Sequence, residues 1–315
     1  MLFGLVIPTA ACLLVALAFG PMVLLIAPFL FGIGHMSSTS QVLSHLWTRE
    51  ISRGQEWTRF FVFGVFVVFG LMKLSPYRIH LYPNGIPLPE IALLVAFISF
   101  GLYASRLRSI QAFVLPIGCI AALFYAPIYA FAGLLFLHNL IAFYYWWALA
   151  SQRETKNLAL LGSCLAIGIA SVIAAGWLDF IFFAISSSFN VQGLLVSSKA
   201  TAADWARTVM PFLNNPIVIY RFVVIAAFGQ LIHYYIWLKS IPRLGLPKAL
   251  PQGVNHGTRI IFAGAGLCLL TLAILDPGLA RIVYVALAAA HGLVELGTLP
   301  LLTSRQPEGK LWKTI

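Results

Sequence analysis

The sequence predicts an all-α protein, a polytopic integral membrane bundle of about ten transmembrane helices that forms a single domain over residues 1–315. Composition is the first reason: 61% of the residues are hydrophobic and 9% are charged. The mean hydropathy is +0.93, which is typical of a membrane protein. The second reason is the pattern, because apolar runs of membrane-spanning length recur along the chain and no segment is polar enough for a soluble domain.

Apolar segments between turn residues define the expected helices, whose ends are uncertain by roughly 2–4 residues. The segments are 2–19, 21–46, 59–73, 89–105, 109–126, 128–150, 157–180, 216–239, 259–275 and 280–303. Gly20-Pro21 separates the first two helices, and Pro127 separates the fifth from the sixth, because glycine and proline commonly mark helix ends.

The basic residues favour a topology with both termini in the cytoplasm. The net charge is +11, and most lysines and arginines fall in loops on the side that holds both termini, as the positive-inside rule predicts. The charge therefore indicates a lipid bilayer as partner and no nucleic acid, and we expect a bacterial inner membrane. The cysteines, Cys12, Cys119, Cys164 and Cys268, are scattered in apolar runs, which indicates small buried side chains and no disulfides.

Histidines inside the predicted helices indicate a metal site. His35, His138, His233 and His291 lie on the second, sixth, eighth and tenth helices, which all run in the same direction across the membrane. Neutral imidazole is a common ligand of iron, copper and zinc. One histidine from each of four helices at similar depth predicts a shared metal ion. A proton or ion pathway and structural hydrogen bonding between helices are the alternatives.

Glu295 is the one acidic residue that the predicted helices place at mid-membrane, one helical turn beyond His291. A lone charge at the bilayer centre costs about 2.5–3.5 kcal/mol or more, so this carboxylate is expected to have partners. We predict a catalytic role for Glu295, either as a direct metal ligand or as a group that orients a ligand.

Polar neighbours on the same helices are expected to orient two of the histidines. Gln230 lies three residues before His233, and Ser38 and Thr39 lie three and four residues after His35. Residues at these spacings share a helix face, and such partners fix the tautomer of a metal-binding imidazole. They are therefore predicted to surround the metal ligands.

Aromatic residues follow two of these histidines. The runs FYYWW (143–147) and YYIW (234–237) lie on the C-terminal side of His138 and His233. Such runs are typical of the aromatic belt at a membrane interface. The alternative is the lining of a site for a long apolar or polyene ligand.

Several short motifs resemble the Brp/Blh family of bacterial membrane-bound carotene-cleaving oxygenases. Gly34-His35, the run Tyr125-Ala126-Pro127 with Phe131-Ala132 and His138, and Ala290-His291-Gly292 are similar to the family's histidine elements. In this chain no proline precedes the first histidine, no acid follows it, and no second histidine is near His138. The resemblance implies a multi-helix membrane protein that uses histidine-bound iron to cleave β-carotene to retinal.

These observations predict a membrane-embedded, non-haem iron oxygenase that acts on a hydrophobic substrate of the isoprenoid or carotenoid class. The four histidines would hold Fe(II) and leave a coordination position open for O₂. Iron is preferred through the resemblance, since imidazole ligands also suit haem and other transition metals. The alternatives are a proton-coupled transporter with a relay of His233, His291 and Glu295, and a non-catalytic subunit or assembly factor of a larger complex.

Overall fold

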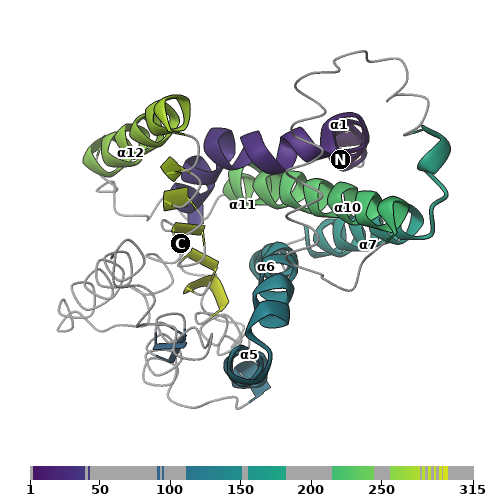
Figure 1. Cartoon of the computed structure of the whole chain (residues 1–315), viewed down its shortest axis with the longest axis horizontal. Helices are drawn as coiled ribbons and strands as arrows, with labels where there is room; N and C mark the ends of the chain where they lie inside the picture. Colours follow the sequence, from purple (N-terminus) through teal and green to yellow (C-terminus); the bar gives the residue numbers. More distant parts are fainter. Residues whose placement is uncertain are drawn as a thin grey trace. The chain divides into compact units, whose positions relative to one another are not determined.

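The computed structural model describes residues 3–39, 42, 91–92, 94–95, 111–150, 155–181, 215–244, 256–276, 279–280, 283–284, 287–288, 291–292 and 294–296. All regular structure in these residues is helical, which confirms the all-α class (Figure 1). The predicted helix 59–73 and most of 89–105 lie outside the described residues. The number of spans and the side of the termini stay predictions.

The chain divides into two compact units. The first unit is Met1–His35 with Ala142–Pro247, and the second is Met36–Ile141 with Lys248–Ile315. The helices of the first unit are α1 (Phe3–Ala27), η1 (Pro28–Gly32), α7 (Lys156–Ala174), α10 (Pro216–Tyr235), η4 (Ile236–Ser240) and α11 (Ile241–Arg243). The second unit contains α5 (Gln111–Tyr125), α12 (His256–Leu275) and the first part of α6 (Pro127–Ala150), whose last residues belong to the first unit.

Three helices in the described part of the chain are long and apolar enough to cross a membrane, judged by length and composition. They cover Leu5–Leu24, Lys156–Ala174 and Pro216–Arg243. Two of them agree with the predicted segments 157–180 and 216–239, whereas Leu5–Leu24 runs across the boundary predicted at Gly20-Pro21. Membrane association of the protein is therefore supported.

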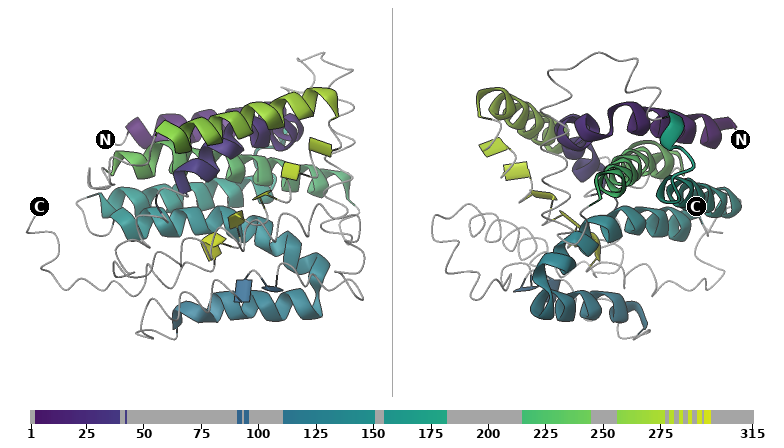
Figure 2. Two further views of the ribbon diagram at one scale, coloured as in Figure 1. Left: turned by 90° about the vertical axis from the view of Figure 1, so that its left-hand side faces the viewer. Right: turned by 45° about the vertical axis from the view of Figure 1, so that its right-hand side comes forward.

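In the first unit, α1 and α10 run side by side, and α7 packs against α10 (Figure 2). Gly20 allows close packing, because a Cβ at this position would lie 3.6 Å from Val224 Cγ2 and 3.8 Å from Ala227 Cβ. α1 is kinked at Phe19, whose φ is −132° and ψ is 22°. The break expected at Gly20-Pro21 is thus a kink inside one helix, since proline disturbs the preceding turn without ending the apolar segment.

Pro21 has a second effect on the same turn. Proline has no N–H, so it cannot donate to the Leu17 carbonyl four residues earlier. Tyr220 Oη on α10 donates to this carbonyl over 3.0 Å. The helix–helix hydrogen bond therefore satisfies an acceptor that the proline leaves open, which matters in an apolar environment.

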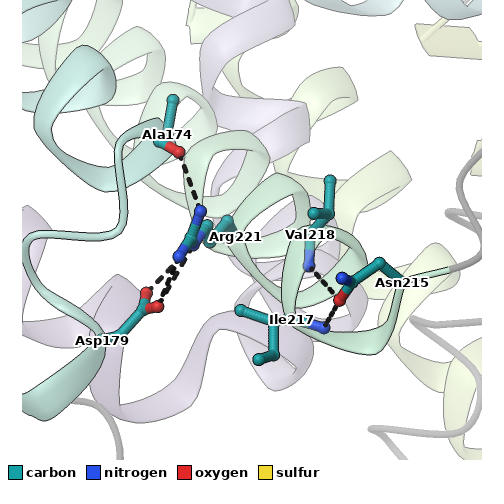
Figure 3. A network of polar contacts seen from close by, with 6 residues as sticks. All are labelled: Ala174, Asp179, Asn215, Ile217, Val218 and Arg221. Carbon is teal, nitrogen blue, oxygen red and sulfur yellow. Dashed lines mark hydrogen bonds and ion pairs between the residues drawn. The ribbon is translucent and has the colours of Figure 1, made fainter.

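The start of α10 and the end of α7 are held by polar side chains (Figure 3). Asn215 Oδ1 accepts from the backbone N–H groups of Ile217 and Val218, so Asn215-Pro216 is a helix start of the kind that sequence rules describe. Arg221 donates to both oxygens of Asp179, with Nη2 at 2.7 Å from Oδ2, and its Nη1 donates to the Ala174 carbonyl.

In the second unit, the helix ends lie close to the positions that the sequence predicts. α5 ends at Tyr125 and α6 begins at Pro127, as predicted, because proline is favoured at the first position of a helix. Asp276 follows α12, and its Oδ1 accepts from the backbone N–H of Leu279. This cap begins the last helical residues of the described chain, which include His291 and Glu295.

The cysteines are free thiols, as predicted. Cys12 and Cys119 are half-buried, whereas Cys164 and Cys268 are exposed on α7 and α12. The expectation that all four are buried was therefore wrong for two of them. An apolar run alone does not tell which face of a membrane helix is turned outward.

Candidate metal centre

Each unit brings two of the four predicted histidines together. In the first unit the pair is His35 and His233, and in the second unit it is His138 and His291. In the second pair, both histidines lie within 3.1 Å of the carboxylate of Glu295.

His35 and His233 are both buried in the first unit. His35 lies in the helical residues 33–39 that follow η1, and His233 lies in the last turn of α10. Their Nε2 atoms are 2.8 Å apart, and the rings meet nearly edge to face with centroids at 4.3 Å. The pair therefore shares one hydrogen bond, with the donor set by the tautomers.

A π-helical segment lies beside each of these two histidines. η1 begins at Pro28 and precedes His35, whereas η4 follows His233 and ends just before Pro242 in α11. A proline removes one helical donor, and a π-helical turn is one way to rearrange the hydrogen bonds around it. Such turns are frequent at functional sites.

The separation of the two Nε2 atoms limits the kind of metal that this pair could bind. Ligand bonds of about 2.0–2.1 Å at a right angle place neighbouring nitrogen atoms about 2.9 Å apart. The two axial ligands of a haem iron are instead about 4 Å apart, one on each side of the ring. The pair, at 2.8 Å, fits two adjacent ligands of one ion and does not fit both axial positions of a haem.

Buried aromatic rings surround the histidine pair. Trp237 and Tyr234 have ring centroids 5.7 Å and 5.6 Å from that of His35, and Tyr145 is 5.3 Å from Trp237. Tyr145, Tyr234 and Trp237 are at most 4% exposed, as is Trp146. These rings lie in the interior of the first unit and give the pair apolar walls.

In the second unit, His138 and His291 converge on one carboxylate. His138 Nδ1 lies 3.0 Å from Glu295 Oε2, and His291 Nε2 lies 3.1 Å from Glu295 Oε1. The two imidazole centroids are 5.5 Å apart, at an interplanar angle of 83°. Glu295 is fully buried, and an acid in an apolar interior requires polar partners. The two imidazole groups are such partners.

Two further residues shape this cluster. Thr39 Oγ1 donates to Glu295 Oε1 over 3.1 Å, and both residues are fully buried. A Cβ at Gly292 would lie 3.2 Å from His138 Nδ1, so glycine allows the imidazole to lie against the helix that carries His291. Gly292 belongs to one of the histidine motifs in the sequence, but this contact was not predicted, because the sequence does not show which side chain lies against the glycine.

The predicted orienting residues have other contacts than those expected. Thr39 was predicted to act on His35, and its hydroxyl bonds to Glu295. Gln230 was predicted to act on His233, and its Nε2 donates to the hydroxyl of Tyr234 over 2.9 Å. Ser38 is half-buried in the same helical turn as Thr39. Their effect on the histidines stays a prediction.

His35, His233, His291 and Glu295 are buried and His138 is half-buried, and imidazole and carboxylate groups of this kind could hold a metal ion. Their ligand chemistry suits several divalent transition metals and does not choose among them. Comparisons of the chain with family models, with characterised proteins and with solved structures gave no match.

Proposed function

We propose that this protein is an integral membrane metalloenzyme, a non-haem iron oxygenase that acts on a hydrophobic, isoprenoid-type substrate. The observation that carries the proposal is the convergence of His138 and His291, from separate helices, on the buried carboxylate of Glu295. Placing histidines and an acid in an apolar protein interior costs free energy, so such groups usually have a functional role. Metal binding is the purpose that this set of groups fits best.

The donor set fits ferrous iron. Two histidines with a carboxylate are typical of non-haem iron oxygenases, whether the acid binds the metal or orients its ligands. Sites built for structural zinc instead use four closed ligands and usually include cysteine. Among the described residues, the cysteines lie in α1, α5, α7 and α12 and are not part of the histidine clusters.

We further propose that His35 and His233 serve the same ion. This proposal follows from the sequence, in which the four histidines lie at similar depth on predicted helices that run in the same direction. The adjacent-ligand spacing of the His35–His233 pair is consistent with this role. The four imidazoles would then leave at least one coordination position for a small molecule.

Bound iron would supply the ability to activate O₂. The chain's own contribution is to position the ligands, to exclude water with the buried rings of Tyr145, Tyr234 and Trp237, and to offer apolar surface. A hydrophobic substrate would reach such a site from the bilayer. The resemblance of the histidine motifs to carotene-cleaving oxygenases supports an isoprenoid, and the charge distribution supports a bacterial inner membrane with both termini in the cytoplasm.

Metal analysis of the purified full-length protein tests the proposal. We expect about one iron per chain, and a loss of most of it in His138→Ala and in His291→Ala. His256→Ala, at the first residue of α12, is the matched control and should keep its iron. Absence of bound metal in the unmodified protein, together with substrate-driven flux into vesicles, would instead support a transporter.

A further inference from the structure

The close contacts of His138 and His291 with Glu295 indicate which nitrogen atom of each histidine is available to a metal. His138 faces the carboxylate with Nδ1, whereas His291 faces it with Nε2. An ionised carboxylate only accepts hydrogen bonds, so a nitrogen that bonds to it must carry a hydrogen. A nitrogen that carries a hydrogen cannot bind a metal ion, and the opposite nitrogen of the same ring is left for that purpose.

The polar groups around Glu295 are those expected for a carboxylate that orients histidine ligands. Oε1 accepts from Thr39 Oγ1 and lies 3.1 Å from His291 Nε2, whereas Oε2 lies 3.0 Å from His138 Nδ1. One hydroxyl donor and two imidazole nitrogen atoms thus lie within 3.1 Å of the oxygens of one fully buried carboxylate. The threonine hydroxyl at hydrogen-bond distance also limits the rotation of the carboxylate.

Gly292 supports the same orientation from the other side of His138. The atoms nearest to a Cβ built at Gly292 are His138 Nδ1 at 3.2 Å, Cγ at 3.5 Å and Cε1 at 3.8 Å. The Nδ1 edge of the imidazole therefore lies against the helix that carries His291 and Glu295. The Nε2 atom is the part of the ring that is farther from this helix.

We propose that Glu295 is an orienting carboxylate and not a metal ligand, and that Thr39 and Gly292 are positioning residues that hold this arrangement. His138 then binds the metal through Nε2 and His291 binds it through Nδ1. This inference rests on the proposed metal-binding function and specifies it further. All five residues belong to the second unit.

The ligand atoms can be identified by nuclear magnetic resonance of the full-length protein in detergent, labelled with ¹⁵N-histidine and loaded with ¹¹³Cd²⁺ as the probe. We expect couplings from the cadmium to Nε2 of His138 and to Nδ1 of His291, with the signals assigned through His138→Ala and His291→Ala. Couplings to Nδ1 of His138 and Nε2 of His291 would overturn the inference and leave the proposed function intact. Absence of cadmium, zinc and iron binding would overturn both.

Variants of Thr39 separate positioning from folding. Thr39→Ser keeps the hydroxyl and should keep metal affinity close to that of the unmodified protein. Thr39→Val has nearly the same shape without the donor, and we expect a loss of about 10–100-fold in affinity, as for other groups that orient metal ligands. Equal affinities of the serine and valine variants, with both folded, would contradict the role of Thr39.

A metal-free measurement gives an independent readout. In the unloaded protein, the ¹⁵N shifts should report a hydrogen on Nδ1 of His138 and on Nε2 of His291. Gly292→Ala should change the His138 signals more than those of His256, because the new Cβ would press on the Nδ1 edge of His138. A His138 ring that carries its hydrogen only on Nε2 would refute the proposal without any metal.

Discussion

The hydroxyl of Tyr220 donates a hydrogen bond to the carbonyl of Leu17, 3.0 Å away, which is the acceptor that Pro21 cannot serve. A kink-forming proline in α1 and a tyrosine in α10 are therefore parts of one structural feature. In an apolar environment such a carbonyl has no water to replace the lost donor.

This relationship predicts a specific coupling between two substitutions. Tyr220→Phe should lower the free energy of unfolding by about 1 kcal/mol, because it leaves the Leu17 carbonyl without its donor. Pro21→Ala restores a helical N–H for the same carbonyl, so Tyr220→Phe should cost less in the Pro21→Ala background. Unfolding in detergent by a double-mutant cycle measures the difference, and equal costs in both backgrounds would contradict the coupling.

The histidine pair of the first unit makes a second prediction. His35→Ala or His233→Ala should lower the affinity for Zn²⁺ or Fe²⁺ by more than about 10-fold, because each removes one of two adjacent ligands. The double variant should lose more affinity than either single variant if all four histidines serve one ion, because it leaves two of the four ligands. Two ions per chain in the unmodified protein, with one retained in His35→Ala, would show that each pair binds its own metal.

Gly162 and Gly168 on α7 form a matched pair for testing packing. A Cβ at Gly162 would lie 2.7 Å from the Trp146 ring, whereas a Cβ at Gly168 meets no atom within 4 Å. Gly162→Ala should therefore reduce stability by about 1–3 kcal/mol through overpacking. Gly168→Ala should be neutral or stabilising by up to about 1 kcal/mol, since alanine favours the helix. Chemical unfolding of both variants measures these changes in the free energy of unfolding. Equal changes would count against the close contact with Trp146.

The ion pair between Arg221 and Asp179 should contribute to the joining of α10 to the end of α7. Arg221→Gln should lower the melting temperature in detergent by a few degrees, and by more than Asp179→Asn does, because arginine also bonds to the Ala174 carbonyl. Arg221→Lys keeps the charge without the planar group that binds both carboxylate oxygens, so an intermediate value is expected. A melting temperature for Arg221→Gln at or above that of Asp179→Asn would argue against the extra bond.

The local features of the fold followed from the sequence, whereas the partners of the buried polar groups did not. Asn215-Pro216 and Pro127 mark helix starts because capping and proline geometry depend only on neighbouring residues. The contact of His291 with Glu295 could also be predicted from the sequence, since it joins residues four apart on one helix.

The remaining contacts required the packing of helices that are distant in the chain. Thr39 was assigned to His35 because the two share a helix face, and nothing in the sequence connects it to Glu295, which is 256 positions away. The Arg221–Asp179 pair was missed for the same reason, since the charges of α10 and α7 become neighbours only after packing. Residues that share a helix face are candidates for a contact, and the packing of the helices decides which of them meet.

The π-helical segments η1 and η4 have a consequence for how this chain tolerates changes of length. A π-helical turn holds about one residue more than an α-helical turn, so the loss of one residue there converts it to a regular helix and leaves the flanking faces in phase. A deletion in the middle of α1 or α10 would instead rotate every following side chain. The stretches beside His35 and His233 are therefore the places where these two helices can be shortened by one residue while both imidazoles keep their direction.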